Sequence, residues 1–348
     1  MPVTQSLFRH PKLLFARMLF ILTGLLSACG DQVWNSPYPP EQAGQNILYS
    51  SFSERPKHLD PARSYSSNEV VFTGQIYEPP LQYHFLKRPY QLEPATVTTL
   101  PVPHYLDEQG LRLPADAPAD KIAYSVYDME IQAGIHYQPH PAFAKDEQGQ
   151  FLYHALSEQD LESVETLSDF HENGSRELVA EDYALQIKRL AHPRLHSPIL
   201  GLMSDYIVGL GDYAATLKQA FEDNSEVESA AVSLDLRDYP LAGVEVLDRY
   251  RYRVRIHGKY PQFLYWLAMP FFAPVPPEAD RFYSQPGMTQ RNITLDWYPV
   301  GTGPYMLTIN NPNRRMVLER NPNFHGETYP DEGMPGDAAD GLLDDAGK

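Results

Sequence analysis

The sequence predicts an α/β fold, because strand-like and helix-like segments alternate along a chain of globular composition. Its 348 residues are 43% hydrophobic, which is enough to bury the core of two domains or of one large domain. Residues 124–131 (YSVYDMEI) alternate as a strand with one buried face does. Four large apolar side chains recur at helical spacing and predict one helix face: Val179, Tyr183, Ile187 and Leu190.

The other elements follow from local patterns. We expect further strands at residues 46–52, 81–86, 244–247, 252–256, 305–309 and 316–320. We expect further helices at residues 68–77, 197–210, 213–221 and 261–268. Pro79 and Pro80 end the first of these helices, because the residue before a proline is disfavoured in the helical conformation. Proline-rich residues 101–120 predict a surface loop, and residues 140–176 predict a polar, irregular insertion.

Charge and cysteine content exclude several classes of protein. The formal net charge is −17, and such a field repels phosphate backbones, so we expect no nucleic-acid partner. The single cysteine, Cys29, excludes an internal disulfide and a zinc site built from cysteines.

Residues 1–28 are typical of an export signal. Three basic residues and no acid precede an apolar stretch at residues 18–26, which is too short to span a bilayer. The sequence Leu26-Ser27-Ala28-Cys29 that follows resembles the bacterial lipobox, in which the cysteine is lipid-modified and becomes the N-terminus. We therefore expect Cys29 to be the lipid attachment site and residues 29–45 to be a tether. The alternative is a plain signal peptide in which the cysteine has no special role.

The C-terminal residues have a different composition from the rest. Residues 331–348 contain six acidic residues, four glycines and only three larger apolar side chains. Such a segment buries too little apolar surface to fold alone. We expect residues 326–348 to form an acidic, flexible tail.

No motif for catalysis or metal binding stands out. Two histidine pairs have the four-residue spacing of metal ligands on a helix, but a proline interrupts each of them, so we expect no metal site there: His136/His140 and His192/His196. No nucleophile motif is found around a serine or cysteine, and no catalytic dyad can be assembled, so we do not expect an enzyme.

Three further features have a structural and a functional interpretation. Gly301 to Tyr305 (GTGPY) lacks the lysine of a phosphate loop, and a tight backbone crossing explains its glycines better. Asp60, before Pro61, is either a catalytic acid or a turn former, and the turn is favoured. An aromatic run either stacks on a ligand or packs in the core, and core packing is favoured: Tyr260, Phe263, Tyr265, Trp266, Phe271 and Phe272.

Seven segments, taken in order, resemble the bacterial extracellular solute-binding proteins of peptide and nickel ABC importers, such as the oligopeptide- and dipeptide-binding proteins. They are residues 59–62 (LDPA), 76–81 (IYEPPL), 129–137 (MEIQAGIHY), 180–193 (AEDYALQIKRLAHP) with Ser197-Pro198, 270–276 (PFFAPVP), 301–305 (GTGPY) and 316–324 (MVLERNPNF). The resemblance extends from about residue 46 to residue 325. The sequence departs from the family pattern at residues 131–134 and in the polar insertion, which indicates a divergent subgroup and leaves the ligand class open.

The resemblance implies a two-lobed, periplasmic-binding-protein-like clamp with a mixed sheet, in which the ligand lies between the lobes. In this family the chain first crosses to the second lobe just after the segment matched by residues 301–324. We therefore expect residues 46–325 to form lobe one, mostly present, with lobe two missing. In peptide binders of the family, the stretch before the Leu-Asp-Pro motif pairs with the peptide main chain. This maps to Ser53, Glu54 and Arg55, with Glu54 available to the ligand's ammonium group.

The function implied is that of a lipid-anchored substrate-binding component of an ABC importer that captures peptides. Its expected partners are a peptide or other small solute, an ABC permease, and the membrane through the N-terminal lipid; no cofactor is expected. The expected location is the cell envelope, on the extracytoplasmic or periplasmic side. The alternatives are a binder of a nickel chelate, haem or sugar, a non-functional truncated fragment, and a tethered hydrolase.

Overall fold

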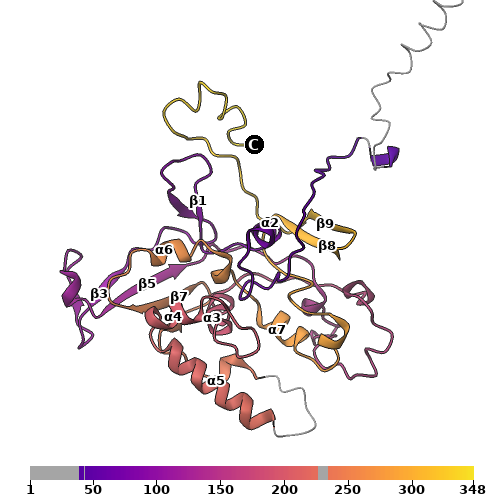
Figure 1. Ribbon diagram of the computed structural model, residues 1–348, viewed down its shortest axis with the longest axis horizontal. Helices are drawn as coiled ribbons and strands as arrows, with labels where there is room; N and C mark the ends of the chain where they lie inside the picture. Colours follow the sequence, from indigo (N-terminus) through magenta and orange to yellow (C-terminus); the bar gives the residue numbers. More distant parts are fainter. Residues whose placement is uncertain (1–38, 43, 226–233) are drawn as a thin grey trace, which may run out of the picture. The chain divides into compact units, whose positions relative to one another are not determined.

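The computed structural model describes residues 39–42, 44–225 and 234–348 (Figure 1). They belong to two compact units, Met1–Ser53 and Glu54–Lys348, each of which is described by itself. The expected export signal and Cys29 lie outside the described residues. In the described part of the first unit, a short 3₁₀ helix, η1 (Pro40–Gln42), is followed by irregular chain. The strand expected at residues 46–52 is wrong, because this stretch pairs with no other backbone segment in the described residues.

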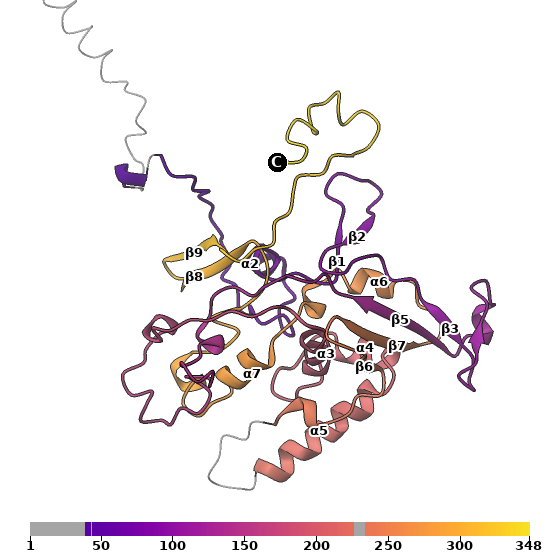
Figure 2. The same ribbon diagram turned by 180° about the vertical axis from the view of Figure 1, so that it is seen from behind.

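A five-stranded antiparallel sheet is the centre of the second unit, with the order β4-β3-β5-β7-β6. Its strands are β3 (His104–Leu106), β4 (Arg112–Leu113), β5 (Tyr124–Glu130), β6 (Val244–Val246) and β7 (Arg251–His257). The long strands β5 and β7 pair over seven residues, from Tyr124 opposite His257 to Glu130 opposite Arg251. Strands far apart in the sequence therefore form the middle of the sheet (Figures 1 and 2).

Helices cover one face of this sheet. They include α3 (Ala180–Arg189), α4 (Leu200–Tyr206) and α6 (Phe263–Trp266), and α5 (Leu210–Ser225) packs against α4. The ring of Tyr183 in α3 stacks on Tyr252 in β7 with centroids 5.2 Å apart, and Phe263 in α6 lies 5.2 Å from Tyr127 in β5. The buried aromatic rings are thus contributed by both the sheet and its covering helices. The opposite face carries the ion pair between Asp128 and Arg253.

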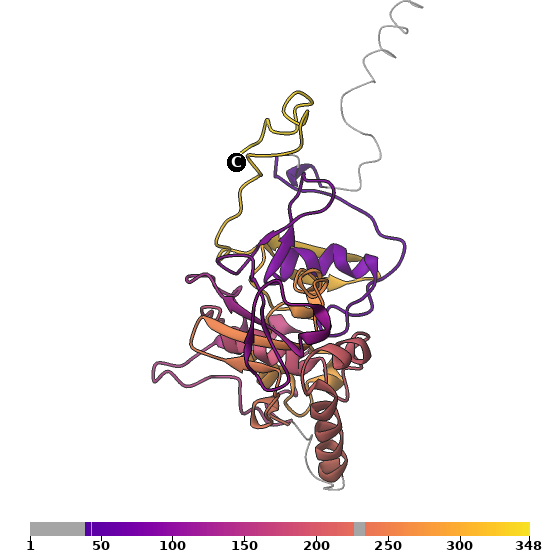
Figure 3. The same ribbon diagram turned by 90° about the vertical axis from the view of Figure 1, so that its left-hand side faces the viewer.

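A second, smaller core lies where α2 (Ser67–Ile76) packs against a hairpin of β8 (Tyr305–Asn311) and β9 (Arg315–Arg320), as Figure 3 shows. Its buried apolar residues are Leu59, Phe72, Ile76, Tyr77, Ala273 and Leu307. Another hairpin pairs β1 (Leu81–Tyr83) with β2 (Leu92–Pro94), and α7 (Pro277–Tyr283) follows the aromatic run. The remaining 3₁₀ helices are η2 (Ala119–Lys121), η3 (Pro141–Phe143), η4 (Leu167–Asp169), η5 (Leu236–Asp238), η6 (Pro270–Phe272) and η7 (Thr289–Arg291).

The α/β class is confirmed, with differences in detail. The surface loop expected at residues 101–120 contains the short strands β3 and β4. Strand β3 pairs with β5, and β4 pairs with β3. Their sequences have no clear strand pattern, so these strands depend on pairing with their neighbours. All strand pairs of the described residues are antiparallel. The parallel pairs that a mixed sheet also contains would need long crossover connections, and they are not among the described pairs.

Residues 326–348 form neither helix nor strand. This segment contacts the β1–β2 hairpin, since Gln82 donates a 2.6 Å hydrogen bond to Glu327 and the rings of Phe85 and Tyr329 lie 5.6 Å apart. Lys87 also pairs with Glu332. That this tail is flexible stays a prediction. Across the described part of the chain, none of the helices has the length and apolar character needed to cross a membrane.

Candidate functional site

The three residues expected to contact ligand are exposed and lie outside any strand. Ser53 ends the first unit, and Glu54 and Arg55 begin the second. The carbonyl oxygens of Glu54 and Arg55 accept hydrogen bonds from the Asn68 amide, at 3.4 and 3.1 Å. The Arg55 guanidinium donates to Asn313 in the β8–β9 turn at 2.8 Å. The start of α2 and the β8–β9 hairpin therefore hold Glu54 and Arg55 in place.

Glu69 fixes the chain that follows this segment. Its buried carboxylate, near the start of α2, accepts hydrogen bonds from two pairs of backbone N–H groups: those of Lys57 and His58, at 3.1 and 2.9 Å, and those of Tyr65 and Ser66, at 3.0 and 3.2 Å. Burial raises the pKa of Glu69, but the N–H donors outweigh it and hold the pKa below its ordinary value. One ionised side chain thus joins residues 57–58 to the helix.

Replacing Glu69 with glutamine should lower the free energy of unfolding by about 2 kcal/mol at neutral pH, because the amide removes the charge and one of the two oxygens that accept the four partly buried N–H groups. Since folding depresses the pKa of Glu69, its contribution is full above the ordinary value of 4.5 and decreases as the pH falls through the folded-state value. Urea unfolding at neutral and acidic pH measures this. Glu319→Gln, at an exposed position of β9, is the control. Equal losses for both variants would contradict the assignment.

Asp60 joins two of the family-like segments. The Arg189 guanidinium donates to both Asp60 carboxylate oxygens, at 3.0 and 2.7 Å, and both residues are buried. Burial raises the pKa of Asp60, but Arg189 and the Ala62 N–H outweigh this and keep the pKa below its ordinary value. The predicted turn is confirmed by the 2.9 Å bond from the Ala62 N–H. The ion pair, whose partners lie 129 residues apart, was not predicted from the sequence.

The Asp60–Arg189 ion pair is one bridge between distant segments, and Arg176 forms a second. Its guanidinium donates two 2.7 Å hydrogen bonds to Asp182, at the start of α3, and bonds of 2.8 and 2.6 Å to Glu278 in α7. Asp182 also accepts the Val179 N–H at 3.0 Å. Arg176 lowers the pKa of Glu278 below its ordinary value, against the effect of burial, which raises it. The polar insertion that carries Arg176 is thereby tied to both helices.

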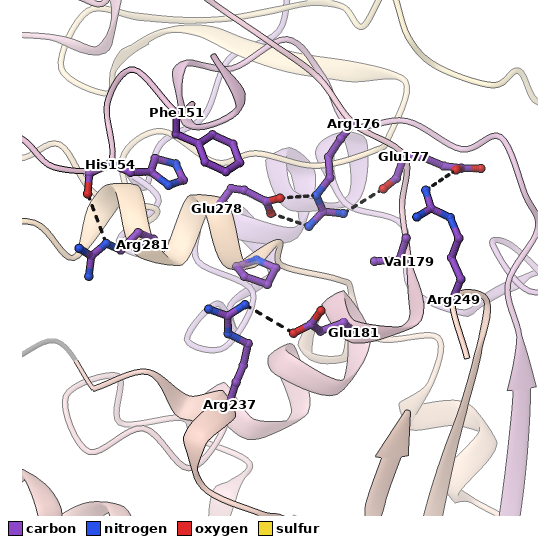
Figure 4. Close-up of a pocket in the computed structure, with 11 residues that line it drawn as sticks. Phe151, His154, Arg176, Glu177, Val179, Glu181, Arg237, Arg249, Glu278 and Arg281 are labelled. Atoms are coloured by element: carbon purple, nitrogen blue, oxygen red, sulfur yellow. Dashed lines mark hydrogen bonds and ion pairs between the residues drawn. The ribbon is translucent and has the colours of Figure 1, made fainter. Parts of the chain in front are cut away.

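A pocket of about 320 Å³ lies beside this bridge (Figure 4). Phe151, His154 and Arg281 lie at one end of the pocket, and Glu177 and Arg249 at the other. The remaining lining residues are Arg176, Val179, Glu181, Arg237, Pro277 and Glu278. The sequence analysis did not find this pocket, because its walls come from segments separated by up to 130 residues.

The first histidine pair, His136 and His140, makes hydrogen bonds within the protein. His140 is buried, accepts the Ala142 N–H at Nδ1 and lies 2.8 Å from the Tyr283 hydroxyl at Nε2. Burial lowers its pKa to about 3, so the ring is neutral at physiological pH. His136 is exposed and lies 2.9 Å from the Gly134 carbonyl. No group of three or more potential metal-ligating side chains is found among the described residues.

The glycines of the GTGPY segment lie against the end of α2. A Cβ on Gly301 would be 2.0 Å from the Ile76 carbonyl oxygen, and one on Gly303 would be 2.7 Å from the same atom. The Gly303 N–H donates to that oxygen at 2.9 Å. The predicted tight backbone crossing is confirmed, although its partner is the last residue of a helix. Of the aromatic run, Phe263, Phe271 and Phe272 are buried as expected, whereas Tyr265 is 46% exposed.

Residues 170–333 match a known protein family, described as "Bacterial extracellular solute-binding proteins, family 5 Middle". The match covers a little under half of the chain, and this part of the chain is similar to the solute-binding family. The match includes Arg176, Asp182, Arg189 and Glu278, the residues that form most of the two bridges, and it confirms the family that the ordered motifs indicated. No curated protein matches the chain.

Solved structures similar to this chain include periplasmic binding proteins. One is the DppA protein of Helicobacter pylori in complex with a peptide, at 19% identity and a TM-score of 0.45, covering 82% of this chain and 42% of the other. The peptide-bound OppA protein of Listeria monocytogenes has 13% identity and a TM-score of 0.44, with coverages of 77% and 37%. The murein tripeptide binding protein of Escherichia coli has 13% identity and a TM-score of 0.45, with coverages of 78% and 38%. The chain spans about two fifths of the length of these structures.

Proposed function

We propose that this chain is the lipid-anchored substrate-binding component of an ABC importer and that it captures peptides outside the cytoplasmic membrane. The match of residues 170–333 to the solute-binding family carries the proposal. Residues 46–325 would form the first lobe of a clamp, preceded by a signal at residues 1–28 and a tether at residues 29–45, and followed by the tail at residues 326–348. The role is that of a binding protein, with an ABC permease as the partner that receives the solute.

The proposed peptide contact is main-chain pairing along Ser53, Glu54 and Arg55. Backbone in this stretch is exposed and forms no strand, so its N–H and C=O groups are accessible to an extended peptide. A peptide that adds as a strand gains affinity from main-chain hydrogen bonds and needs little sequence preference. Asn68 already donates to two carbonyl oxygens of the stretch, so peptide binding would displace or share these bonds.

Glu54 would pair with the peptide's ammonium group, because its carboxylate is exposed and forms no ion pair within the described residues. Tri-alanine should therefore bind about two- to fivefold more tightly than N-acetylated tri-alanine, as expected for an exposed ion pair. Glu54→Gln should remove this difference, whereas Glu319→Gln should preserve it. Titration calorimetry measures both. Failure of tri-alanine to bind at all would overturn peptide capture.

The anchor is tested at Cys29. The native gene product should fractionate with membranes, because acyl chains on an N-terminal cysteine bury their methylene groups in the bilayer. Cys29→Ala should yield soluble protein or an uncleaved precursor. Identical soluble fractionation of both proteins would contradict lipid attachment.

A further inference from the structure

The turn between β8 and β9 lies beside Glu54 and Arg55. The Arg55 guanidinium donates to the Asn313 side chain in this turn at 2.8 Å, although the two residues are 258 positions apart in the sequence. Within the turn, the Arg314 N–H donates to the Asn311 carbonyl at 2.9 Å, and the Asn313 N–H donates to the Asn311 side chain at 3.2 Å. The turn is therefore held in one form next to the residues that are proposed to contact peptide.

This part of the surface is rich in cations. Among residues 53–57 and 311–315, Glu54 is the one acidic residue, whereas the whole chain has 45 acidic and 28 basic residues. Four basic side chains here are exposed, and in the described part of the chain no carboxylate lies within 4.0 Å of any of them: Arg55, Lys57, Arg314 and Arg315. The local charge is thus opposite in sign to that of the whole chain.

Two of these cations are the nearest to the proposed peptide contact. Arg55 belongs to it, and Arg314 directly follows Asn313, the residue that Arg55 contacts. Met316 packs against the core beside α2, so Arg315, its neighbour on β9, points to the other face of the hairpin. Exposed charges act on one another over about 8–10 Å at physiological salt, so Arg55 and Arg314 act together on a ligand at Glu54.

We propose that Arg55 and Arg314 give peptide capture a preference for acidic peptides. The inference rests on the proposed peptide contact along Ser53, Glu54 and Arg55. An extended peptide advances about 3.3 Å per residue, so a side chain one or two positions after an ammonium group at Glu54 reaches the neighbouring arginines. A guanidinium binds a carboxylate through two parallel hydrogen bonds, and the local positive field attracts acidic peptides that the rest of the chain repels.

The test compares two peptides of nearly equal size, Ala-Glu-Ala and Ala-Gln-Ala, by titration calorimetry on the full chain. Ala-Glu-Ala should bind about fivefold more tightly at low salt, as expected for exposed ion pairs. At high salt the ratio of the two affinities should approach one, because exposed charges are screened. Ala-Lys-Ala should bind more weakly than Ala-Gln-Ala.

Variants of the turn assign the preference. Arg314→Gln should reduce the affinity ratio to about two, and Arg314→Glu should bring it below one, because the added carboxylate repels the acidic peptide. Arg320→Gln is the matched control, since it removes an exposed arginine at the far end of the same strand, and it should leave the ratio unchanged. Arg314 is exposed, so neither of its variants should change the unfolding midpoint.

The outcomes separate this inference from peptide capture itself. Equal binding of Ala-Glu-Ala and Ala-Gln-Ala at low salt, or a ratio that Arg314→Glu leaves unchanged, would overturn the acidic preference and leave peptide capture intact. Failure of all three peptides to bind would overturn peptide capture, and the acidic preference with it.

Discussion

Arg189→Leu should lower the free energy of unfolding by about 3–5 kcal/mol, because it leaves the Asp60 carboxylate buried without its partner. Asp60 is 2% exposed and Arg189 is 4% exposed, so water cannot replace the two lost hydrogen bonds. The substitution also removes the 3.2 Å contact from Arg189 to Asp280 and the 3.0 Å bond to Gln186. Urea unfolding followed by tryptophan fluorescence measures the loss.

Two further variants test whether the loss comes from the unpaired buried charge. Asp60→Asn combined with Arg189→Leu should be less destabilised than Arg189→Leu alone, because no unpaired charge stays buried. Arg253→Leu breaks a half-exposed pair with Asp128 in the sheet and should cost less than about 1 kcal/mol. If Arg189→Leu costs no more than Arg253→Leu, the buried pair does not hold the two segments together.

Gly301→Ala should be the most damaging single methyl addition in the second unit, with a loss of about 3 kcal/mol or more. The new Cβ would lie 2.0 Å from the Ile76 carbonyl oxygen, a backbone atom at the end of α2 that cannot move without the helix. Moving the loop instead would break the 3.0 Å bond from the Gln138 N–H to the Gly301 carbonyl. Thermal and urea unfolding measure the loss.

The control is Gly201→Ala. Gly201 lies in α4, and beyond its chain neighbours and the backbone of its own helix no atom is within 4 Å of the added Cβ. Alanine is a better helix former than glycine, so this variant should be neutral or up to about 1 kcal/mol more stable. Similar unfolding midpoints for both variants would contradict the close crossing at Gly301.

Elements with strong periodicity were predictable from the sequence. Strand β5 and helix α3 appear where alternation and helical spacing placed them, and the large apolar residues of both patterns are buried, although α3 is also buried at most of its polar positions. Strands β3 and β4 were not predictable, since two or three residues carry no period and depend on the edge of β5 for pairing. Residues 46–52 have strand-forming side chains but no strand beside them in the described residues, so propensity alone did not make a strand.

In the candidate sites, too, local motifs were predictable from the sequence and long-range contacts were not. The ordered motifs indicated the family, but not the contacts between motifs. Arg189 and Asp60 are 129 residues apart, and Arg176 and Glu278 are 102 residues apart. Pairing over such separations depends on the tertiary fold and leaves no local spacing to recognise. The arginine-lined pocket was missed for the same reason, since its walls come from the polar insertion, α3, η5, the turn before β7 and α7.

Amide hydrogen exchange along Ser53, Glu54 and Arg55, with and without tri-alanine, tests the peptide-capture account most directly. Main-chain pairing with an added strand protects amide hydrogens from solvent, so these three amides should exchange more slowly with peptide and should slow more than any other group in the chain. N-acetylated tri-alanine should produce less protection. Slowing confined to the arginine-lined pocket, or unchanged exchange at all three amides with peptide bound, would contradict the account.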